Sequence, residues 1–166
     1  MSGAGHIDPS NKKVALLIAV LAAFLAFSET LGSSAQTEAL SRNIEASNLW
    51  AFFQAKTIRM TTLRTAAEAL EVDAALAPDP ESKAVINKRI EIWKKTAARY
   101  ESEPETNDGR KELMARAKAA EQKRDRSLAA YHQFEIASGA LQIAIVLASA
   151  NRSEEHTSEL QSHHDL

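Results

Sequence analysis

Residue types that could carry chemistry are few in this chain, and their spacing matches none of the common catalytic patterns. The sequence contains no cysteine, which excludes disulfides, thiolate metal ligands and cysteine nucleophiles. It also has no glycine-rich phosphate loop, no His-Glu-x-x-His zinc motif and no Gly-x-Ser-x-Gly nucleophile turn. We therefore expect no catalytic, cofactor-binding or metal-binding residues, and we expect that the protein is not an enzyme.

Two single side chains still have a chemical interpretation. Glu29 lies within an apolar stretch, and an ionisable group in or near a membrane is a candidate for proton or cation transfer. That role needs a partner, and the second apolar stretch offers only Gln142. We favour the interpretation that Glu29 lies at the lipid head groups and marks the end of a span. His132 follows Tyr131 on a predicted helix and is expected to be interfacial or solvated.

Charge patterning gives little indication of a polyanionic partner. The formal net charge is -2 at pH 7. One basic run could contact anionic lipid or nucleic acid, but Glu121 and Asp125 interleave with it, which favours a solvated, salt-bridged helix face. The run comprises Lys118, Lys123, Arg124 and Arg126. We expect no nucleic-acid partner.

The densest aromatic cluster is formed by Trp50, Phe52 and Phe53. One interpretation is a lipid-interface belt, but about 27 Å of helix would separate the cluster from the end of the first apolar stretch. We therefore predict that these rings pack against Trp93 and Tyr100 inside a helical bundle.

Residues 152–166 (RSEEHTSELQSHHDL) interrupt an apolar run and show no apolar period. Their codons can be read without a mismatch from a short-read sequencing adapter followed by its index. We interpret the segment as an adapter-derived artefact and exclude it from reasoning about the fold; the alternative is an ordinary polar tail. The exclusion removes a metal-site hypothesis that would rest on His156, His163 and His164. The native sequence is expected to continue beyond about residue 151 with more apolar residues.

Two apolar stretches predict membrane spans. Residues 1–11 are expected to form a flexible N-terminus, residues 12–32 a transmembrane helix, and residues 134–151 a truncated second transmembrane helix. Lys12 and Lys13 before the first stretch, with Ser33 and Ala35 after it, also match a cleavable signal peptide. The second stretch favours a retained anchor, although it could instead be an amphipathic helix that packs on a soluble core.

Residues 33–133 are predicted to form a helical bundle or coiled-coil-like region. Helices are expected at about 35–76, 83–103 and 110–134, with Pro-containing breaks between them. Because short turns favour antiparallel neighbours, the helices are expected to run down, up and down. Three- and four-residue steps predict the core positions, which are Leu49, Phe53, Met60, Leu63, Ala67, Leu70, Ile86, Ile90, Trp93, Ala97, Tyr100, Leu113, Ala117, Leu128 and Tyr131.

The stretch from Asn11 to Ala150 resembles the bacterial family known as domain of unknown function 4337, most specifically over Asn48–Arg64 and again in HQFEIASGALQIAIVLASA. The resemblance implies a small membrane protein with an N-terminal span, a helical middle and two C-terminal spans. This chain lacks part of the second span and all of the third. The resemblance implies no catalytic residues.

These observations predict an all-α fold with an N-terminal transmembrane helix, a long helical-hairpin or coiled-coil-like middle, and the start of a C-terminal transmembrane helix. The leading hypothesis is a structural or interaction protein without a cofactor, anchored in the bacterial inner membrane with its N-terminus in the cytoplasm. Its partners would be the lipid bilayer and, through the middle region, a second copy or a partner helix. The alternatives are a subunit of a small ion-coupled or transport membrane protein, and an exported soluble helical protein with a cleaved signal peptide.

Overall fold

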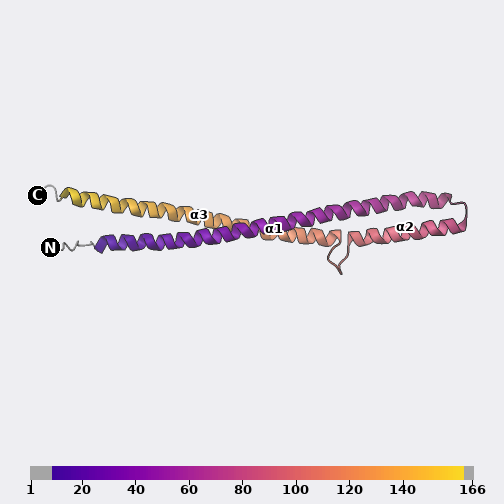
Figure 1. The fold of residues 1–166 in the computed structure, drawn as a ribbon, viewed down its shortest axis with the longest axis horizontal. Coiled ribbons are helices and arrows are strands. Elements are labelled where there is room, and N and C mark those ends of the chain that lie inside the picture. The colour runs from indigo at the N-terminus through magenta and orange to yellow at the C-terminus, as the bar shows by residue number, and fades with distance from the viewer. Residues whose placement is uncertain (1–8, 163–166) are drawn as a thin grey trace, which may run out of the picture. The chain divides into compact units, whose positions relative to one another are not determined.

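The computed structural model describes residues 9–162, with side chains over residues 12–150, and consists there of three helices without a strand (Figure 1). α1 comprises Pro9–Leu76, α2 comprises Pro80–Glu101 and α3 comprises Arg110–Ser162. The predicted all-α fold is confirmed. The helices form two compact units, a central unit of Ala39–Asp125 and a terminal unit made by the described residues before and after it.

Several predictions concern the two ends of the chain, where the side chains are not described. These are the side chains of most of the predicted flexible N-terminus and of residues 151–162, which include His156. His163 and His164 lie outside the described residues altogether. The backbone of α3 continues as helix to Ser162, so it includes much of the segment interpreted as an adapter-derived tail.

α1 runs without a break through the boundary at which two separate helices were expected. Residues 12–32 and 35–76 are parts of one helix. The helix continues through Gly32. This residue is buried, and a Cβ atom there would lie 3.3 Å from the Cβ of Phe134 on α3. The small residues at this point therefore serve close helix packing instead of a turn.

The protein-facing side of α1 repeats at four- and three-residue steps along almost its whole described length, which is the spacing of a coiled coil. We call these buried or half-buried positions the seam. They are Val14, Ile18, Leu21, Leu25, Ser28, Gly32, Ala35, Ala39, Arg42, Ala46, Leu49, Phe53, Lys56, Met60, Leu63, Ala67, Leu70 and Ala74. The core positions predicted on this helix all belong to the seam. Its many alanines allow the neighbouring helix to approach closely.

The core of the central unit consists of two clusters along α1. One joins Ala46 and Leu49 of α1 to Leu113, Ala117 and Ala120 of α3. The other joins Ala67 and Ala74 of α1 to Ile90 of α2. α2 and the beginning of α3 therefore pack against successive parts of the same helix.

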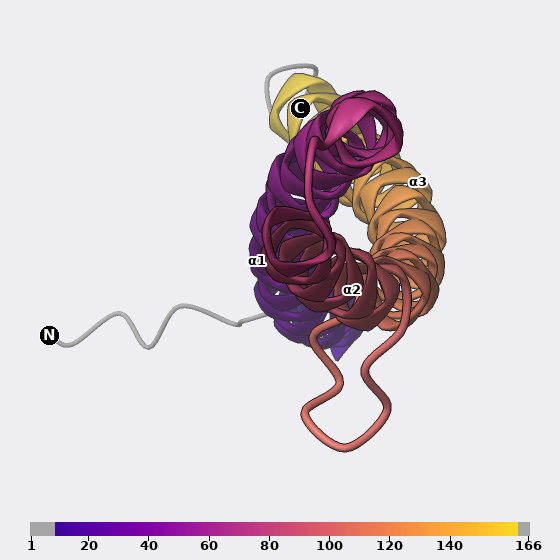
Figure 2. The ribbon, with the colours of Figure 1, turned by 90° about the vertical axis from the view of Figure 1, so that its right-hand side faces the viewer.

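The predicted down, up, down order is wrong for the central unit. On α2, Lys94 pairs with Glu71 while Glu101 pairs with Arg64, so α2 runs antiparallel to α1. On α3, Arg110 binds Thr57 and Arg124 binds Asn43, so α3 is antiparallel to α1 as well. The chain does not reverse between α2 and α3, and residues 102–109 form a loop that projects from the helices (Figures 1 and 2).

Leu128 was predicted to face the core and is instead 39% exposed. The protein-facing positions of α3 follow the steps Leu113, Ala117, Ala120, Arg124 and Ser127, and Leu128 lies one residue out of that phase. Tyr131, the other predicted position here, is half-buried in phase with them.

The turn between α1 and α2 is built by local polar contacts. α1 ends at Leu76, two residues before Pro78, and Pro80 opens α2 at a position that needs no backbone donor. The Asp79 carboxylate caps α2, because Oδ1 accepts from the Ser82 backbone nitrogen at 2.8 Å and Oδ2 accepts from the Ser82 hydroxyl at 2.8 Å.

Replacing Trp93 with alanine is expected to destabilise the central unit by about 2 kcal/mol. Trp93 is half-buried against the α1–α2 cluster, with the Arg89 guanidinium 5.7 Å from its ring centroid. The cost should therefore fall below the roughly 3–5 kcal/mol of a fully buried tryptophan. Urea unfolding of the full chain in mild detergent, followed by helical circular dichroism, measures it. An unchanged midpoint would show that Trp93 does not pack in the seam, and the exposed Val85→Ala serves as the control.

Candidate functional site

Two helices contain stretches with the length and composition of a membrane span. The most apolar windows of the described residues lie within Lys12–Leu76 and Arg110–Ala150, with mean hydropathies of 2.3 and 1.4. Only 6% and 0% of these windows are buried. Many of their large apolar side chains point outward and are at least 44% exposed: Leu16, Leu17, Val20, Phe24, Phe27, Leu31, Ile136, Ile143, Val146 and Leu147. So much apolar surface without a protein neighbour is typical of a membrane or protein contact.

Polar side chains of these stretches meet between α1 and α3. Ser28 is 7% exposed, and its hydroxyl donates to the Phe134 carbonyl oxygen at 3.0 Å. The Gln142 Nε2 donates to Glu29 Oε1 at 3.5 Å, so the structure brings together the two residues that the sequence suggested as partners. Hydrogen bonds and small residues of this kind hold helices together inside membranes.

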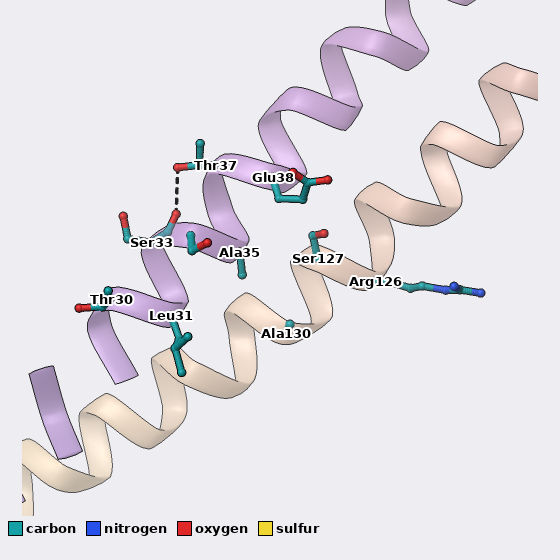
Figure 3. Close-up of a pocket in the computed structure, with 10 residues that line it drawn as sticks. Thr30, Leu31, Ser33, Ala35, Thr37, Glu38, Arg126, Ser127 and Ala130 are labelled. Atoms are coloured by element: carbon teal, nitrogen blue, oxygen red, sulfur yellow. Dashed lines mark hydrogen bonds between the residues drawn. The ribbon is translucent and has the colours of Figure 1, made fainter. Parts of the chain in front are cut away.

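A shallow groove lies close by in the terminal unit, between α1 and α3 (Figure 3). The Thr37 hydroxyl donates to the Ser33 carbonyl oxygen at 2.9 Å and the Thr30 hydroxyl to that of Ala26 at 2.8 Å, so both are bonded to their own helix. Figure 3 shows Arg126 extending away from the groove. The lining comprises Thr30, Leu31, Ser33, Ser34, Ala35, Thr37, Glu38, Arg126, Ser127 and Ala130.

The densest polar network of the central unit is centred on Arg110, at the start of α3. Its guanidinium donates to Glu101 at 2.8 Å and to the Thr57 hydroxyl at 2.8 Å, and lies 4.8 Å from the centroid of the Phe53 ring. One side chain thus ties α1, α2 and α3 together. This arrangement holds the three helices together.

A second cation lies beside it on α1. Lys56 Nζ donates to Asp108 of the projecting loop at 2.7 Å and lies 5.2 Å from the centroid of the Tyr100 ring. The Lys56 side chain is 12% exposed. Charge at this seam position is balanced by the loop, which fixes the loop to α1.

Glu112 closes the junction between α2 and α3. Its Oε1 accepts from the Ser102 hydroxyl at 2.6 Å and its Oε2 from the Glu103 backbone nitrogen at 3.1 Å. The Ser102 hydrogen bond is the main reason why the pKa of Glu112 is lowered from its ordinary value of 4.5. The backbone hydrogen bond from Ser82 likewise lowers the pKa of Asp79 below its ordinary 3.8.

The lowered pKa values of Asp79 and Glu112 predict that the central unit loses stability in acid. Because their folded pKa values are depressed, the stability they contribute is complete above the unfolded pKa and is lost as pH falls through the folded value. We expect the urea midpoint to hold from pH 7 to about pH 5 and to fall below about pH 4.5. The variants Glu112→Gln and Asp79→Asn should each lower the midpoint at pH 7 and reduce its fall on acidification. The exposed Glu105→Gln is the control, and an undiminished fall in both variants would contradict the prediction.

Of the histidines named in the predictions, only His132 has a described side chain. His132 lies on an exposed part of α3, where its Nδ1 is 3.4 Å from an oxygen of Glu135 one turn away. Among the residues described, no group of three His, Cys, Asp or Glu side chains gathers in a way that could hold a metal ion.

The predicted salt-bridged basic face is present only in part. Arg124 pairs with Asp125 at 2.9 Å and also donates to Asn43 at 3.3 Å. Glu121, expected to neutralise the basic run, accepts instead from Trp50 Nε1 at 2.9 Å.

The predicted contact of Trp50, Phe52 and Phe53 with Trp93 is wrong. Trp50 and Phe53 pack on each other, with ring centroids 5.3 Å apart, and on the α1–α3 cluster around Leu113. Trp93 packs on the separate α1–α2 cluster, and Phe52 is 61% exposed. The expected pairing assumed that all three helices lie side by side, whereas α2 and α3 follow one another along α1.

Sequence reasoning missed the junction residues Lys56, Gly109, Arg110 and Glu112. One signal was available, because Lys56 lies at a four–three seam position at which a charge requires a partner. The partners themselves come from the projecting loop and from the ends of α2 and α3, which apolar periodicity does not describe.

The terminal unit is thus a pair of helices with apolar side chains on the outside, and the central unit is a group of helices held by ion pairs. A family model with the description "Domain of unknown function (DUF4337)" matches residues 10–151. No curated protein and no solved structure matches the chain.

Proposed function

The chain belongs to the family described as domain of unknown function 4337, and from this premise we propose that it is a membrane-anchored helical protein that is structural or interacting and not catalytic. The apolar part of α1 and the apolar part of α3 would cross the bacterial inner membrane. The central unit would present a helical surface for a second copy or a partner helix.

One observation carries this proposal. The apolar windows of α1 and α3 are 6% and 0% buried, whereas the core helix of a soluble protein would be mostly buried. Ser28 is buried between the two helices, and the exposed Gln142 donates to the exposed Glu29 of the other helix. Apolar side chains that face outward, with hydrogen bonds from one helix to the other, are the arrangement that a bilayer favours.

The continuity of α1 supports a retained anchor over a cleaved signal. A cut after Ala35 would fall in the middle of a helix and separate Ser28 and Gly32 from the seam residues that follow. Lys12 and Lys13 support a cytoplasmic N-terminus by the positive-inside tendency. Intact mass of the purified protein distinguishes the retained form from the cleaved one.

Extraction of membranes with alkaline carbonate tests the proposal. The full chain should remain in the pellet and should be released only by detergent. Leu21→Arg places a charge near the centre of the α1 stretch, where insertion costs about 2.5–3.5 kcal/mol, and should shift a large fraction to the soluble or degraded pool. Glu105→Arg, exposed in the projecting loop, is the matched control. Complete release of the unchanged chain by carbonate would overturn membrane anchoring.

The Glu29–Gln142 contact favours one second candidate, an ion-coupled membrane protein. In that case proton or cation flux into vesicles containing the purified chain should be lost in Glu29→Gln. Absence of flux in the unchanged chain would leave the polar pair a helix-packing contact.

A further inference from the structure

The face of α1 opposite the seam carries no charge over the whole central unit. Its positions again recur at three- and four-residue steps, and every one of them is exposed. We call this face the back stripe; it comprises Ser41, Ile44, Asn48, Ala51, Ala55, Ile58, Thr62, Thr65, Ala69, Val72 and Leu76. The charged residues of this part of α1 lie in the seam or on its flanks, at Arg42, Glu45, Lys56, Arg59, Arg64, Glu68, Glu71 and Asp73.

A solvent-facing helix side normally carries charged and polar residues. Here Ile44, Ile58, Val72 and Leu76 are 53%, 67%, 60% and 78% exposed. A shallow apolar hollow between them is lined by Thr57, Ile58, Thr61, Thr62, Thr65, Ala66 and Ala69. The Thr62 hydroxyl donates to the Ile58 carbonyl oxygen at 2.9 Å, so it is bonded within α1 and can be covered without losing a partner.

We propose that the back stripe packs against the back stripe of a second copy of this chain, in parallel and in register. The direction rests on the proposed function, because two copies anchored in one membrane by the same span present α1 in the same direction. A second copy brings no charge onto the stripe, whereas a charged partner would be desolvated without a counter-ion. The alanines of the stripe allow close approach, and contact between identical patches closes as a two-fold dimer.

The available area reaches the minimum for a biological interface. Residues 41–76 of a helix are about 53 Å long, and a contact strip about 10 Å wide covers on the order of 500 Å² on each copy. The total of about 1,000 Å² equals this minimum and lies below the roughly 1,200–2,000 Å² of stable, specific protein interfaces. Contact between the apolar spans would add to it.

Parallel pairing in register also predicts which charged residues of the two copies lie side by side. In parallel pairing, each residue on one flank lies beside the residue five positions later on the other flank of the partner helix. Glu68 of one copy would therefore lie near Asp73 of the other, a like-charge pair. Glu68→Lys should convert this repulsion into attraction and increase dimer formation.

Because the chain contains no cysteine, single cysteines report the interface directly. Thr62→Cys and Thr65→Cys, expressed in membranes and oxidised with copper phenanthroline, should form disulfide-linked dimers. Arg64→Cys is the control on α1, because its side chain is 52% exposed but turned by about 100° from Thr65 and about 200° from Thr62, and it should yield at least five-fold less dimer. Lys95→Cys on the exposed surface of α2 should yield at least ten-fold less. Adding Glu68→Lys to Thr62→Cys should raise the dimer fraction.

Equal cross-linking at all four positions would indicate random collision and would overturn the proposal. Absence of a disulfide-linked dimer at both Thr62→Cys and Thr65→Cys would also overturn the proposal. In that case lipid or another protein covers the back stripe. Carbonate extraction of the same samples separates the two proposals. A retained chain that does not cross-link at the stripe overturns only the self-association, whereas a released chain that cross-links there overturns only the membrane anchoring.

Discussion

Replacing Leu113 with alanine is expected to destabilise the central unit by about 3–4 kcal/mol. Leu113 is 2% exposed and is the largest side chain in the described residues that is buried so completely. Its neighbours in the α1–α3 cluster include Ala46, Ala117 and Ala120, which are too small to fill the space that the substitution leaves. Leucine-to-alanine changes in cores cost about 2–5 kcal/mol, with the higher values where the site cannot collapse.

Because the two tryptophans pack on different clusters, fluorescence can report unfolding around Leu113 alone. Trp50 packs on the Leu113 cluster and Trp93 on the α1–α2 cluster, so a Trp93→Phe background leaves one reporter at the mutated site. Urea unfolding in mild detergent, followed by Trp50 fluorescence, should show a large fall in midpoint. Leu40→Ala, at a residue of α1 that is 60% exposed, should change the free energy of unfolding by no more than about 0.5 kcal/mol. Equal effects of the two substitutions would contradict the placement of Leu113 in the core.

The sequence predicted the elements and the seam well, because both follow from local rules. Apolar residues at four- and three-residue steps place Leu49, Met60 and Ala67 on one side of α1 whatever packs against it. Pro78 and Pro80 end one helix and begin the next because proline lacks a backbone donor and fixes its own dihedral angle. Membrane-span length and composition are likewise local properties of the chain.

The path of the chain after α2 could not be predicted in the same way. Proline and glycine in residues 104–109 indicate that the helix stops, but not the direction in which the next helix leaves. The direction is set by contacts across the junction, between Arg110 and Glu101 and between Glu112 and Ser102. These are made by polar side chains that apolar periodicity does not include. The error about the aromatic contacts follows from this one, since Trp50 and Trp93 meet different helices.

The glycine at the junction, Gly109, gives the second large expected effect. Gly109 is buried, and its backbone does not require a positive φ. Its role is steric, because an added Cβ would meet the Glu112 carboxylate, the Glu103 backbone nitrogen and, at 2.7 Å, the Cα of Ser102. Two of these three atoms are backbone and cannot rotate away. Gly109→Ala must therefore move the end of α2 away from the start of α3.

That movement would break the hydrogen bonds that Glu112 accepts from Ser102 and Glu103. Overpacking costs about 1–3 kcal/mol, and we expect Gly109→Ala to destabilise the central unit by at least this amount. Hydrogen exchange of the amides in residues 102–113 should accelerate first, because the strain arises there.

Gly139 provides the matched control, with the opposite expected sign. A Cβ at Gly139 would meet no atom within 4 Å, and the residue lies inside α3. Alanine there removes the entropic penalty of a helical glycine and should stabilise α3 by up to about 1 kcal/mol. The same substitution thus lowers stability at one glycine and raises it at another, which a general effect of alanine on helix propensity cannot produce. If Gly109→Ala were as stable as the unchanged chain and showed unchanged exchange in residues 102–113, the close junction between α2 and α3 would be contradicted.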